Sequence, residues 1–332
     1  MRIGIIGAGA VGGTLAALLD RAGHEVEATA RGAMLEAIRR DGLRLDGGFG
    51  EHLARLRAAE ALTAPPELAI LATKAQDARA ALEANRPALV GGVPLLVVQN
   101  GLGGIRVARE LLPDSPLLGG LALFAASYLT PGAVTITAAL PLLLGAADGT
   151  PRRVLEEIGR VVGRALPVQL VDDLEAAQWS KLLVNHVNAV PAITGLSVQQ
   201  TIAHPGLRRV IAASMRESVR IAERRGVRLS GMQGVPGRVL HLLGHAPLGI
   251  TALFPRMLAR RMGGVPNPGS TLQSIRRGQL TEIDFLNGAV VAAAAEAGTA
   301  APVNAALVGL VHEVEASGRF LDPAEVVRRV PV

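Results

Sequence analysis

The sequence predicts an α/β domain with a doubly wound parallel sheet, followed by an all-α domain. Three observations support this fold class. In the first half of the chain, short apolar runs typical of buried strands alternate with segments of helical periodicity. Beyond about residue 170, most of the periodic segments have helical spacing. A length of 332 residues also exceeds what one ordinary core holds, which predicts two domains, 1–170 and 171–332.

The first strand, turn and helix contain a glycine motif. The run Met1–Ile6 is typical of a buried strand, and it is followed by Gly7, Ala8, Gly9, Ala10, Val11 and Gly12. In a G-x-G-x-x-G motif, the first glycine permits the tight turn, the second admits a pyrophosphate, and the third lets helix and strand pack closely. A second strand over His24–Ala30 completes the unit. The context therefore favours a dinucleotide site over a glycine turn without a ligand.

The end of the second predicted strand indicates which dinucleotide binds. NAD sites usually carry an acid there, which holds the ribose hydroxyls. Here the residues are Ala28, Thr29, Ala30 and Arg31, with no acid. Arg31 can hold a 2′-phosphate and Thr29 can add a hydroxyl, so we expect NADP(H). The alternative for Arg31 is a solvated loop charge.

Two further strands end in polar residues. The strand-like segment 67–73 stops at Lys74, and the segment 94–98 stops at Gln99 and Asn100. Ligands of open α/β sheets bind beyond the carboxyl ends of the strands. We therefore expect Lys74 and Asn100 to belong to the same site as the glycine motif and Arg31.

Composition excludes several kinds of site. The chain has no cysteine, which excludes disulfides, zinc–thiolate centres and thiol catalysis. The formal charge is +6, but the arginines are scattered and aromatic residues make up only 2%. That pattern favours an anionic small molecule over a nucleic acid. With no secretory signal and no apolar run of about 18 residues, we expect a cytoplasmic protein without a membrane span. We also expect a homodimer and no metal.

The lysines are informative because they are so few. Of the 34 basic residues only Lys74 and Lys181 are lysines, and the rest are arginines. Arginine can replace an ordinary surface lysine, but it cannot replace one that must supply a proton. Both lysines are therefore candidate functional residues.

A polar stripe surrounds Lys181 on a predicted helix, 174–189. Gln178, Lys181, Asn185 and Asn188 are spaced by three, four and three residues, which predicts one shared face. A solvent-facing stripe is the alternative, but the amides differ from the arginines and acids that this chain uses elsewhere. An ammonium among amides is suited to polarise and protonate a carbonyl oxygen. Further helices are expected over 207–225, 235–243, 272–277, 282–297 and 304–315.

A second polar stretch lies near the C-terminus. Ser270 with Gln273 matches a capping box, and Thr281 can cap the helix that carries Glu282. Glu282 and Asp284 would then be first-turn acids that complement the helix dipole. From these residues alone, a capping role and a functional role for Glu282 stay equally open.

These motifs together resemble the ketopantoate reductase (2-dehydropantoate 2-reductase) family over nearly the full length of the chain. The residues that carry the resemblance are the glycine motif, Arg31, Thr73–Lys74, Gln99–Gly101, Trp179–Asn185 and Thr281–Gly288. The resemblance implies a Rossmann domain followed by a helical domain similar to that of 6-phosphogluconate dehydrogenase. It further implies NADPH-dependent reduction of 2-dehydropantoate to pantoate, a step toward pantothenate and coenzyme A.

The resemblance also implies roles for individual residues. Lys181 would donate the proton, and Glu282 would help position the substrate or the lysine. Asn185 would bind the substrate, and Ser270 matches the family's serine for the substrate carboxylate. Lys74 and Asn100 match positions near the nicotinamide ribose, and Asn100 and Asn188 are expected to contact the substrate as well.

The sequence departs from the family pattern on the substrate side. A second asparagine usually follows four residues after the one that matches Asn185, where this chain has Ala189 and places Asn188 one residue earlier. Ser274 replaces an aspartate that is usual there, and residues 231–269 look longer than usual. The alternatives are an NADP-dependent reductase of another 2-oxo acid, such as an opine-like or hydroxy-acid dehydrogenase, and a non-catalytic NADP-sensing protein.

Overall fold

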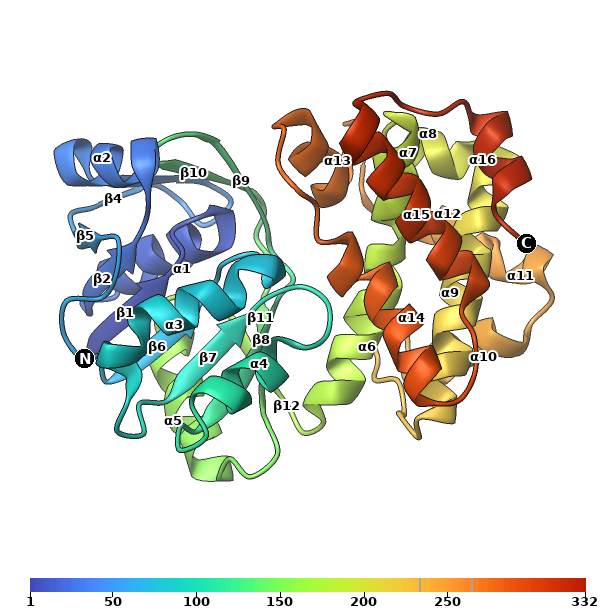
Figure 1. Ribbon diagram of the computed structural model, residues 1–332. Coiled ribbons are helices and arrows are strands. Elements are labelled where there is room, and N and C mark those ends of the chain that lie inside the picture. The colour runs from blue at the N-terminus through green and yellow to red at the C-terminus, as the bar shows by residue number, and fades with distance from the viewer. Residues whose placement is uncertain (233, 264) are drawn as a thin grey trace. The chain divides into compact units, whose positions relative to one another are not determined.

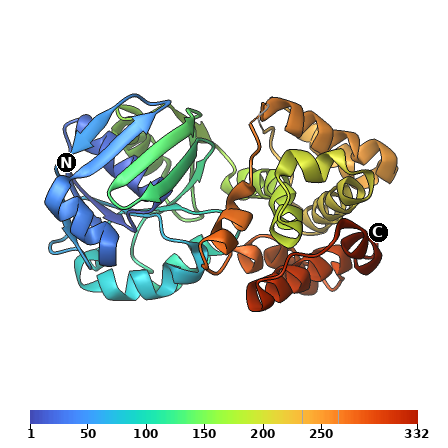
Figure 2. The ribbon, with the colours of Figure 1, turned by 90° about the horizontal axis from the view of Figure 1, so that it is seen from above.

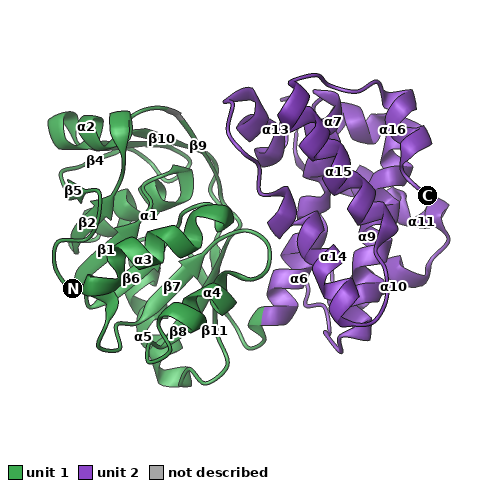
Figure 3. Ribbon diagram, viewed as in Figure 1, with its two compact units in different colours: residues 1–174 green, residues 175–332 purple. Residues whose placement is uncertain are grey.

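The structure is a computed structural model that describes residues 1–232, 234–263 and 265–332. Its contacts divide the chain into two compact units, Met1–Leu174 and Glu175–Val332 (Figures 1 and 3). The first combines strands with helices, and the described part of the second is built from helices (Figure 2). The fold class predicted from the sequence is confirmed.

Unit 1 is built around an eight-stranded sheet. From one edge to the other, its strands are β12 (Val168–Val171), β11 (Leu142–Ala146), β8 (Leu117–Ala122), β7 (Leu95–Val98), β6 (Leu68–Leu71), β1 (Arg2–Ile6), β2 (Glu25–Thr29) and β5 (Arg57–Ala59). All neighbours are parallel except β8 and β11. β6 and β7 are buried over their whole length, as expected for parallel strands covered on both faces.

The remaining elements of unit 1 cover this sheet or form a smaller one. The helices are α1 (Ala10–Arg21), α2 (Gly32–Asp41), the 3-10 turn η1 (Ala75–Asp77), α3 (Ala78–Leu89), α4 (Gly104–Leu111) and α5 (Arg152–Gly163). The smaller sheet has the order β4 (His52–Ala54), β3 (Leu43–Gly47), β10 (Ala133–Ala138), β9 (Ala125–Thr130). α1 contacts strands of both sheets. Gly13 permits this packing, since a Cβ there would lie 3.0 Å from Val134 Cγ1.

The strand order reverses between β1 and β6. From β1 the sheet continues to β2 on one side, and β6, β7 and β8 lie in succession on the other. Ligands of open α/β sheets bind at such a reversal, beyond the carboxyl ends of the strands. This topology therefore makes the segments after β1 and β6 the first place to look for a ligand site.

The division between the units falls after Leu174, whereas the sequence leads us to expect a boundary at residue 170. β12 extends to Val171 and pairs with β11, so the chain stays in the sheet past that point. Leu174 itself lies over β8 and β11, where a Cβ on Gly119 or Gly145 would come within 2.5 or 2.9 Å of its side chain.

Unit 2 consists of helices packed around one long helix, α9. Its elements are α6 (Leu174–Asn185), η2 (His186–Asn188), α7 (Ala189–Thr194), α8 (Val198–Ala203), α9 (Pro205–Arg224), α10 (Gly237–His245), α11 (Leu248–Thr251), α12 (Leu253–Arg261), α13 (Gly269–Arg276), η3 (Ile283–Phe285), α14 (Asn287–Glu296), α15 (Pro302–Ser317) and α16 (Pro323–Arg329). α9 contacts α8, α10, α11, α12, α14, α15, α16 and η2. Among the described residues, no helix is both long and apolar enough to cross a membrane.

Residues 231–269 contain more helix than the sequence predicts. We expect one helix there, 235–243, and the described residues form α10, α11 and α12. α10 and α11 pack against α9, and α12 packs against α8 and α9. The described part of the segment thus packs against α8 and α9.

The single helix expected over 174–189 is interrupted. α6 ends at Asn185, a 3-10 turn covers 186–188, and α7 starts at Ala189. Pro191 accounts for the break, because a proline has no N–H to donate to the carbonyl of Val187 in a continuous helix. In the structure Pro191 occupies the first turn of α7, where its N–H is not needed.

Candidate active site

The glycine turn after β1 has the geometry that the motif predicts. Gly7 has φ 98°, and a Cβ there would lie 2.7 Å from Thr73 Cγ2. A Cβ on Gly12 would lie 1.9 Å from the carbonyl oxygen of Gly7, so α1 can pack on its own turn only with glycine at this position. Gly9 differs, because nothing lies within 4 Å of a Cβ built there.

The open space beside Gly9 lies at the start of α1. Gly9 is the N-cap residue, and its carbonyl accepts the first helical bond, from Gly13 N at 2.7 Å. The N–H groups of Ala10, Val11 and Gly12 therefore belong to a first helical turn, which has no carbonyl partners within the helix. Such a turn favours a bound phosphate, and the helix dipole adds to the attraction. The residues present fit a dinucleotide pyrophosphate.

Thr29 is tied to the glycine turn by two hydrogen bonds. Its hydroxyl accepts a hydrogen bond from Gly7 N at 3.0 Å, and its carbonyl accepts one from Ala8 N at 2.9 Å. Its side chain is 5% exposed. The hydroxyl thus helps to hold the turn, and the expectation that it also contacts a 2′-phosphate stays a prediction.

Arg31 is exposed and stands at the N-terminus of α2, where it is the N-cap residue. The first turn of α2 carries no acidic residue. A guanidinium and a helix N-terminus both attract anions, so their combination suits an additional phosphate group.

Gln99 connects the ends of β6 and β7. Its Nε2 donates to the carbonyl of Thr73 at 2.9 Å and to that of Lys74 at 3.3 Å. The loop that carries Lys74 is thereby held by the residue that precedes Asn100, and both side chains are half-buried. The sequence does not predict this role of Gln99, although its place between a strand end and Asn100 is a usable signal.

The four strand ends expected to form one site are neighbours in the sheet. β7, β6, β1 and β2 are adjacent in that order. They are followed by Asn100, Lys74, Gly7 and Arg31. The order of the strands thus places the expected cofactor residues along one edge of unit 1.

In unit 2, α6 presents two contrasting faces. Trp179, Leu182 and Leu183 are buried, at 1 or 2% exposure. Gln178, Lys181, Asn185 and Asn188 are half-buried. The amides and the ammonium therefore lie on the less buried side, as the spacing predicts for the part of the stripe that α6 carries.

Lys181 and Glu282 interact electrostatically. Burial lowers the pKa of Lys181 to about 8, while the attraction of the Glu282 carboxylate acts in the opposite direction. At neutral pH the side chain still carries its proton, and it releases that proton more readily than an ordinary lysine. This is the property required of a general acid near neutral pH.

The structure separates Glu282 from Asp284. Glu282 precedes η3, and Thr281 Oγ1 accepts a hydrogen bond from Ile283 N at 3.2 Å. Asp284 pairs with His312 at 2.9 Å on the exposed surface. The expectation that Thr281 caps a helix carrying Glu282 is therefore wrong: α14 begins only at Asn287, and Glu282 is itself the N-cap residue of η3, without a side-chain capping bond. Glu282 interacts electrostatically with Lys181.

Asn188 lies beside the start of α13. The turn η2 brings its Oδ1 to 2.5 Å from the position that a Cβ on Gly269 would occupy, and Gly269 has φ 73°. Ser270 comes next and is exposed. Asn188, one residue expected to bind substrate, therefore contacts the glycine that precedes Ser270, another such residue.

The capping box expected for Ser270 and Gln273 does not form. The N-cap residue of α13 is Pro268, without a side-chain capping bond. Asn267 Oδ1 instead accepts a hydrogen bond from Gly269 N at 2.8 Å. The hydroxyl of Ser270 is thus not used to start the helix.

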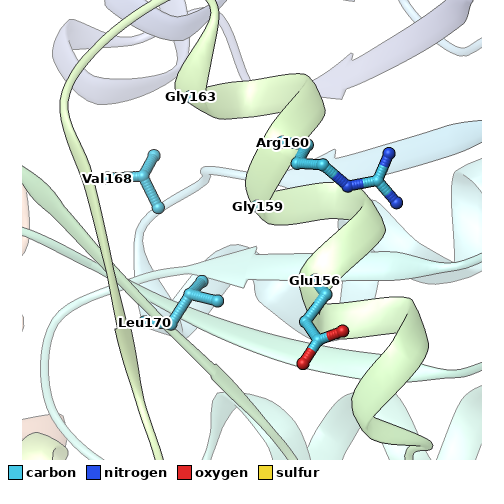
Figure 4. Close-up of a pocket in the computed structure, with 6 residues that line it drawn as sticks. All are labelled: Glu156, Gly159, Arg160, Gly163, Val168 and Leu170. Atoms are coloured by element: carbon cyan, nitrogen blue, oxygen red, sulfur yellow. The ribbon is translucent and has the colours of Figure 1, made fainter.

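A surface hollow of about 470 Å³ in unit 1 contains none of the expected site residues. Figure 4 shows it between α5 and β12, with Glu156 and Arg160 on the helix and Val168 and Leu170 on the strand. Gly159 and Gly163 complete its lining. Because α5 lacks side chains at these two glycines, the hollow follows from local packing. In the part of the chain that the structure describes, no group of three metal-ligating side chains occurs either.

Known proteins support the same division of the chain. The family description "Ketopantoate reductase PanE/ApbA" matches residues 3–149, and "Ketopantoate reductase PanE/ApbA C terminal" matches residues 173–315. A 2-dehydropantoate 2-reductase of Archaeoglobus fulgidus is 28% identical over 319 residues, which is 95% of this chain and 98% of the relative.

Two solved structures have the same fold. The crystal structure of a PanE/ApbA family ketopantoate reductase from Ralstonia eutropha superposes with a TM-score of 0.82 at 28% identity, covering 95% of this chain and 99% of that one. D-mandelate dehydrogenase with NADH and anilino(oxo)acetate gives a TM-score of 0.82 at 21% identity, covering 96% and 99% of the two chains. The second likeness concerns the fold alone.

The matched regions together span most of the sequence, and they contain both the glycine turn and the Lys181–Glu282 pair. They describe an enzyme, an oxidoreductase that acts on CH–OH groups with a nicotinamide nucleotide. The chain belongs to the ketopantoate reductase PanE/ApbA family.

Proposed function

We propose that this chain reduces 2-dehydropantoate to pantoate with NADPH. The observation that carries the proposal is the pairing of Lys181 with Glu282 next to the amide face of α6. A ketone needs a proton donor as hydride reaches its carbon, and a lysine of lowered pKa is suited to that task. Curated relatives that match nearly the whole chain are named 2-dehydropantoate 2-reductase.

The cofactor residues would act through charge and close approach. The first turn of α1 would bind the pyrophosphate beside Gly9, and Arg31 would bind the 2′-phosphate that distinguishes NADP from NAD. Lys74 and Asn100 would bind near the nicotinamide ribose. When bound, the reduced nicotinamide supplies the hydride.

Different residues would bind the carboxylate and the ketone oxygen of a 2-oxo acid. Ser270 and Asn188, whose amide lies beside the preceding Gly269, would donate hydrogen bonds to the carboxylate. Asn185 and Asn100 would hold the remaining polar groups. Lys181 Nζ would donate a hydrogen bond to the ketone oxygen and then transfer its proton as the alkoxide forms. Glu282 keeps the ammonium charged and oriented.

The test measures turnover of purified protein with 2-dehydropantoate, with NADPH and NADH run in parallel and the loss of reduced nicotinamide followed by absorbance. Chiral chromatography of the product identifies pantoate. A panel of other 2-oxo acids runs beside it, because Ala189 and Ser274 depart from the family pattern on the substrate side. A higher kcat/KM for another acid would contradict the proposed substrate, and a preference for NADH would contradict the proposed cofactor.

A further inference from the structure

A cluster of buried polar side chains lies in unit 2 behind the end of α6. We call it the His186 cluster, and it draws on η2, α9, α14 and α15. Its members are His186, Ser214, Glu217, Ser218, Asn287 and Asn304. All are buried except Glu217, which is half-buried. Polar groups of this kind are stable in a core only when their hydrogen bonds are satisfied.

The hydrogen bonds of the cluster select one form of the imidazole. Ser218 Oγ donates to the carbonyl of Ser214 at 2.9 Å, so it accepts from His186 Nε2 at 2.7 Å. On the other side of the ring, Asn287 Nδ2 donates to His186 Nδ1 at 3.0 Å. His186 is therefore neutral, with its proton on Nε2, and burial lowers its pKa to about 3.

Glu217 orients the far end of the cluster. Its carboxylate accepts from the backbone N–H groups of Val303 and Asn304, at 3.1 and 2.9 Å, and from Asn304 Nδ2 at 2.6 Å. The amide of Asn304 is thereby turned so that its Oδ1 accepts from Asn287 Nδ2 at 2.8 Å. The direction of the bond from Asn287 to His186 follows from this chain of donors.

Two members of the cluster follow residues of the proposed site closely in the sequence. His186 lies five residues after Lys181 and immediately after Asn185, and Asn287 lies five residues after Glu282. The bond between His186 and Asn287 therefore joins the turn that ends α6 to the first residue of α14, which follows η3. Lys181 and Glu282 each lie five residues before one of the two residues that form this bond.

We propose that His186 and Asn287 are positioning residues, whose hydrogen bond holds Lys181 and Glu282 at their working separation. The inference rests on the proposed function, because it assigns the two residues a role in that reaction. It predicts that the Nδ1 side of the imidazole matters for the rate, while the Nε2 side matters only for stability.

Two variants of His186 separate these roles. His186→Asn keeps an acceptor near the position of Nδ1, facing Asn287, and gives up the contact with Ser218. His186→Gln reaches the position of Nε2 and gives up the acceptor for Asn287. We expect kcat to fall about tenfold in His186→Gln, which corresponds to about 1.4 kcal/mol, and to fall by much less in His186→Asn. The KM for NADPH should not change in either.

Matched controls separate a positioning role from a general loss of stability. Thr251→Val deletes a buried hydroxyl of the same unit, which contacts the carbonyl of Leu243 at 3.2 Å, and it should lower the melting temperature without lowering kcat. Asn287→Leu should behave like His186→Gln, and the double variant should lose no more rate than the worse single variant. Equal kcat losses in the two His186 variants, or a similar loss in Thr251→Val, would overturn the proposal.

NMR can test the positioning role without measuring catalysis, so that this test does not depend on which substrate the protein reduces. Protein labelled with isotopic lysine gives NMR signals from only Lys74 and Lys181, the two lysines of the chain. The signal of Lys181 should shift in His186→Gln and Asn287→Leu and stay in place in His186→Asn and Thr251→Val. An unmoved Lys181 signal in all variants would reject the positioning role. Absence of turnover by the unaltered protein would instead reject the proposed function.

Discussion

Lys181 lies in an environment that is unusual for a lysine. In a chain that uses arginine for nearly every other cation, a lysine is retained where burial brings its pKa to about 8. An arginine there would stay protonated at all relevant pH values and could not transfer a proton. The lowered pKa of Lys181 and the rarity of lysine in this chain therefore both favour a role as proton donor.

The pH dependence of the reduction should follow Lys181. Because the protonated form is the acid, kcat/KM should be constant at neutral pH and fall as pH rises past about 8. The Glu282 carboxylate stabilises the ammonium, so Glu282→Gln should lower the pKa of Lys181 and move the alkaline limb to lower pH. Steady-state rates across a pH series, measured for the unaltered protein and for Glu282→Gln, give the position of the alkaline limb in each. A limb that moves to higher pH in Glu282→Gln would disprove the electrostatic role of the carboxylate.

Arg31 should decide between the two nicotinamide cofactors. An exposed charge-assisted hydrogen bond lies at the lower end of about 1.5–3 kcal/mol, so Arg31→Gln should raise the KM for NADPH about tenfold. The KM for NADH should stay the same, since NADH lacks the 2′-phosphate. Arg40→Gln, an exposed arginine of the same helix paired with Asp41, is the control. An equal effect on both cofactors would argue against contact with the 2′-phosphate.

At the scale of the elements, the glycines of the first turn serve opposite needs. Gly7 and Gly12 are required by neighbouring protein atoms, whereas Gly9 faces open space. The motif alone shows the three positions but not this difference. Only the packed strand and helix reveal which glycine is left for a ligand.

The two kinds of glycine should respond differently to an added methyl group. Gly12→Ala places a Cβ 1.9 Å from the Gly7 carbonyl oxygen, so it should destabilise the fold by about 1–3 kcal/mol, the usual cost of overpacking. Gly9→Ala should destabilise the fold by less than Gly12→Ala, because nothing lies within 4 Å of a Cβ there and only the preference of an N-cap for glycine over alanine is lost, and it should weaken NADPH binding. Urea unfolding and fluorescence titration measure these effects. An unchanged NADPH affinity in Gly9→Ala would contradict the proposal that the pyrophosphate binds beside Gly9.

The break between α6 and α7 shows how one proline changes an expected face. The periodicity predicts Asn188 on the same helix as Lys181, but Pro191 ends that helix early. The 3-10 turn then brings the Asn188 side chain beside Gly269, at the start of α13. The amide of Asn188 thus lies beside the glycine that precedes Ser270, although it is not on the same helix as Lys181.

At the scale of the whole molecule, the chemistry is divided between two units with separate tasks. Unit 1 carries the residues expected to bind the cofactor, and unit 2 carries Lys181 and Glu282. Neither unit contains both the proposed hydride site and the proposed proton donor. The proposed reduction would therefore use residues of both units, whereas all residues proposed to hold the cofactor belong to unit 1.

This division should appear in a variant of the acid. Lys181→Ala should lower kcat about a hundredfold to ten-thousandfold, the usual contribution of a general acid. The Kd for NADPH should change by less than about twofold, because the change lies in unit 2. Stopped-flow reduction and fluorescence titration measure the two quantities. An unchanged kcat would refute the assignment of Lys181, and an NADP-sensing protein would bind NADPH yet reduce no 2-oxo acid.

The sequence by itself determined the elements and chemistry that depend on local order. Periodicity gave the α/β unit and the helical unit, glycine spacing gave the turn, and the scarcity of lysine singled out Lys181. These features could be predicted because they depend on residues a few positions apart, and the resemblance to a family supplied roles for the rest.

Tertiary structure alone decided which distant groups meet. In the folded chain the hydroxyl of Thr29 accepts a hydrogen bond from the glycine turn, and Asp284 pairs with His312 rather than acting beside Glu282. The side chains of His186, Asn287 and Asn304 come together in one buried cluster. The tertiary structure also showed that Gly9, unlike Gly7 and Gly12, borders open space. Such outcomes depend on contacts between residues up to a hundred positions apart, and the packing of whole elements sets them.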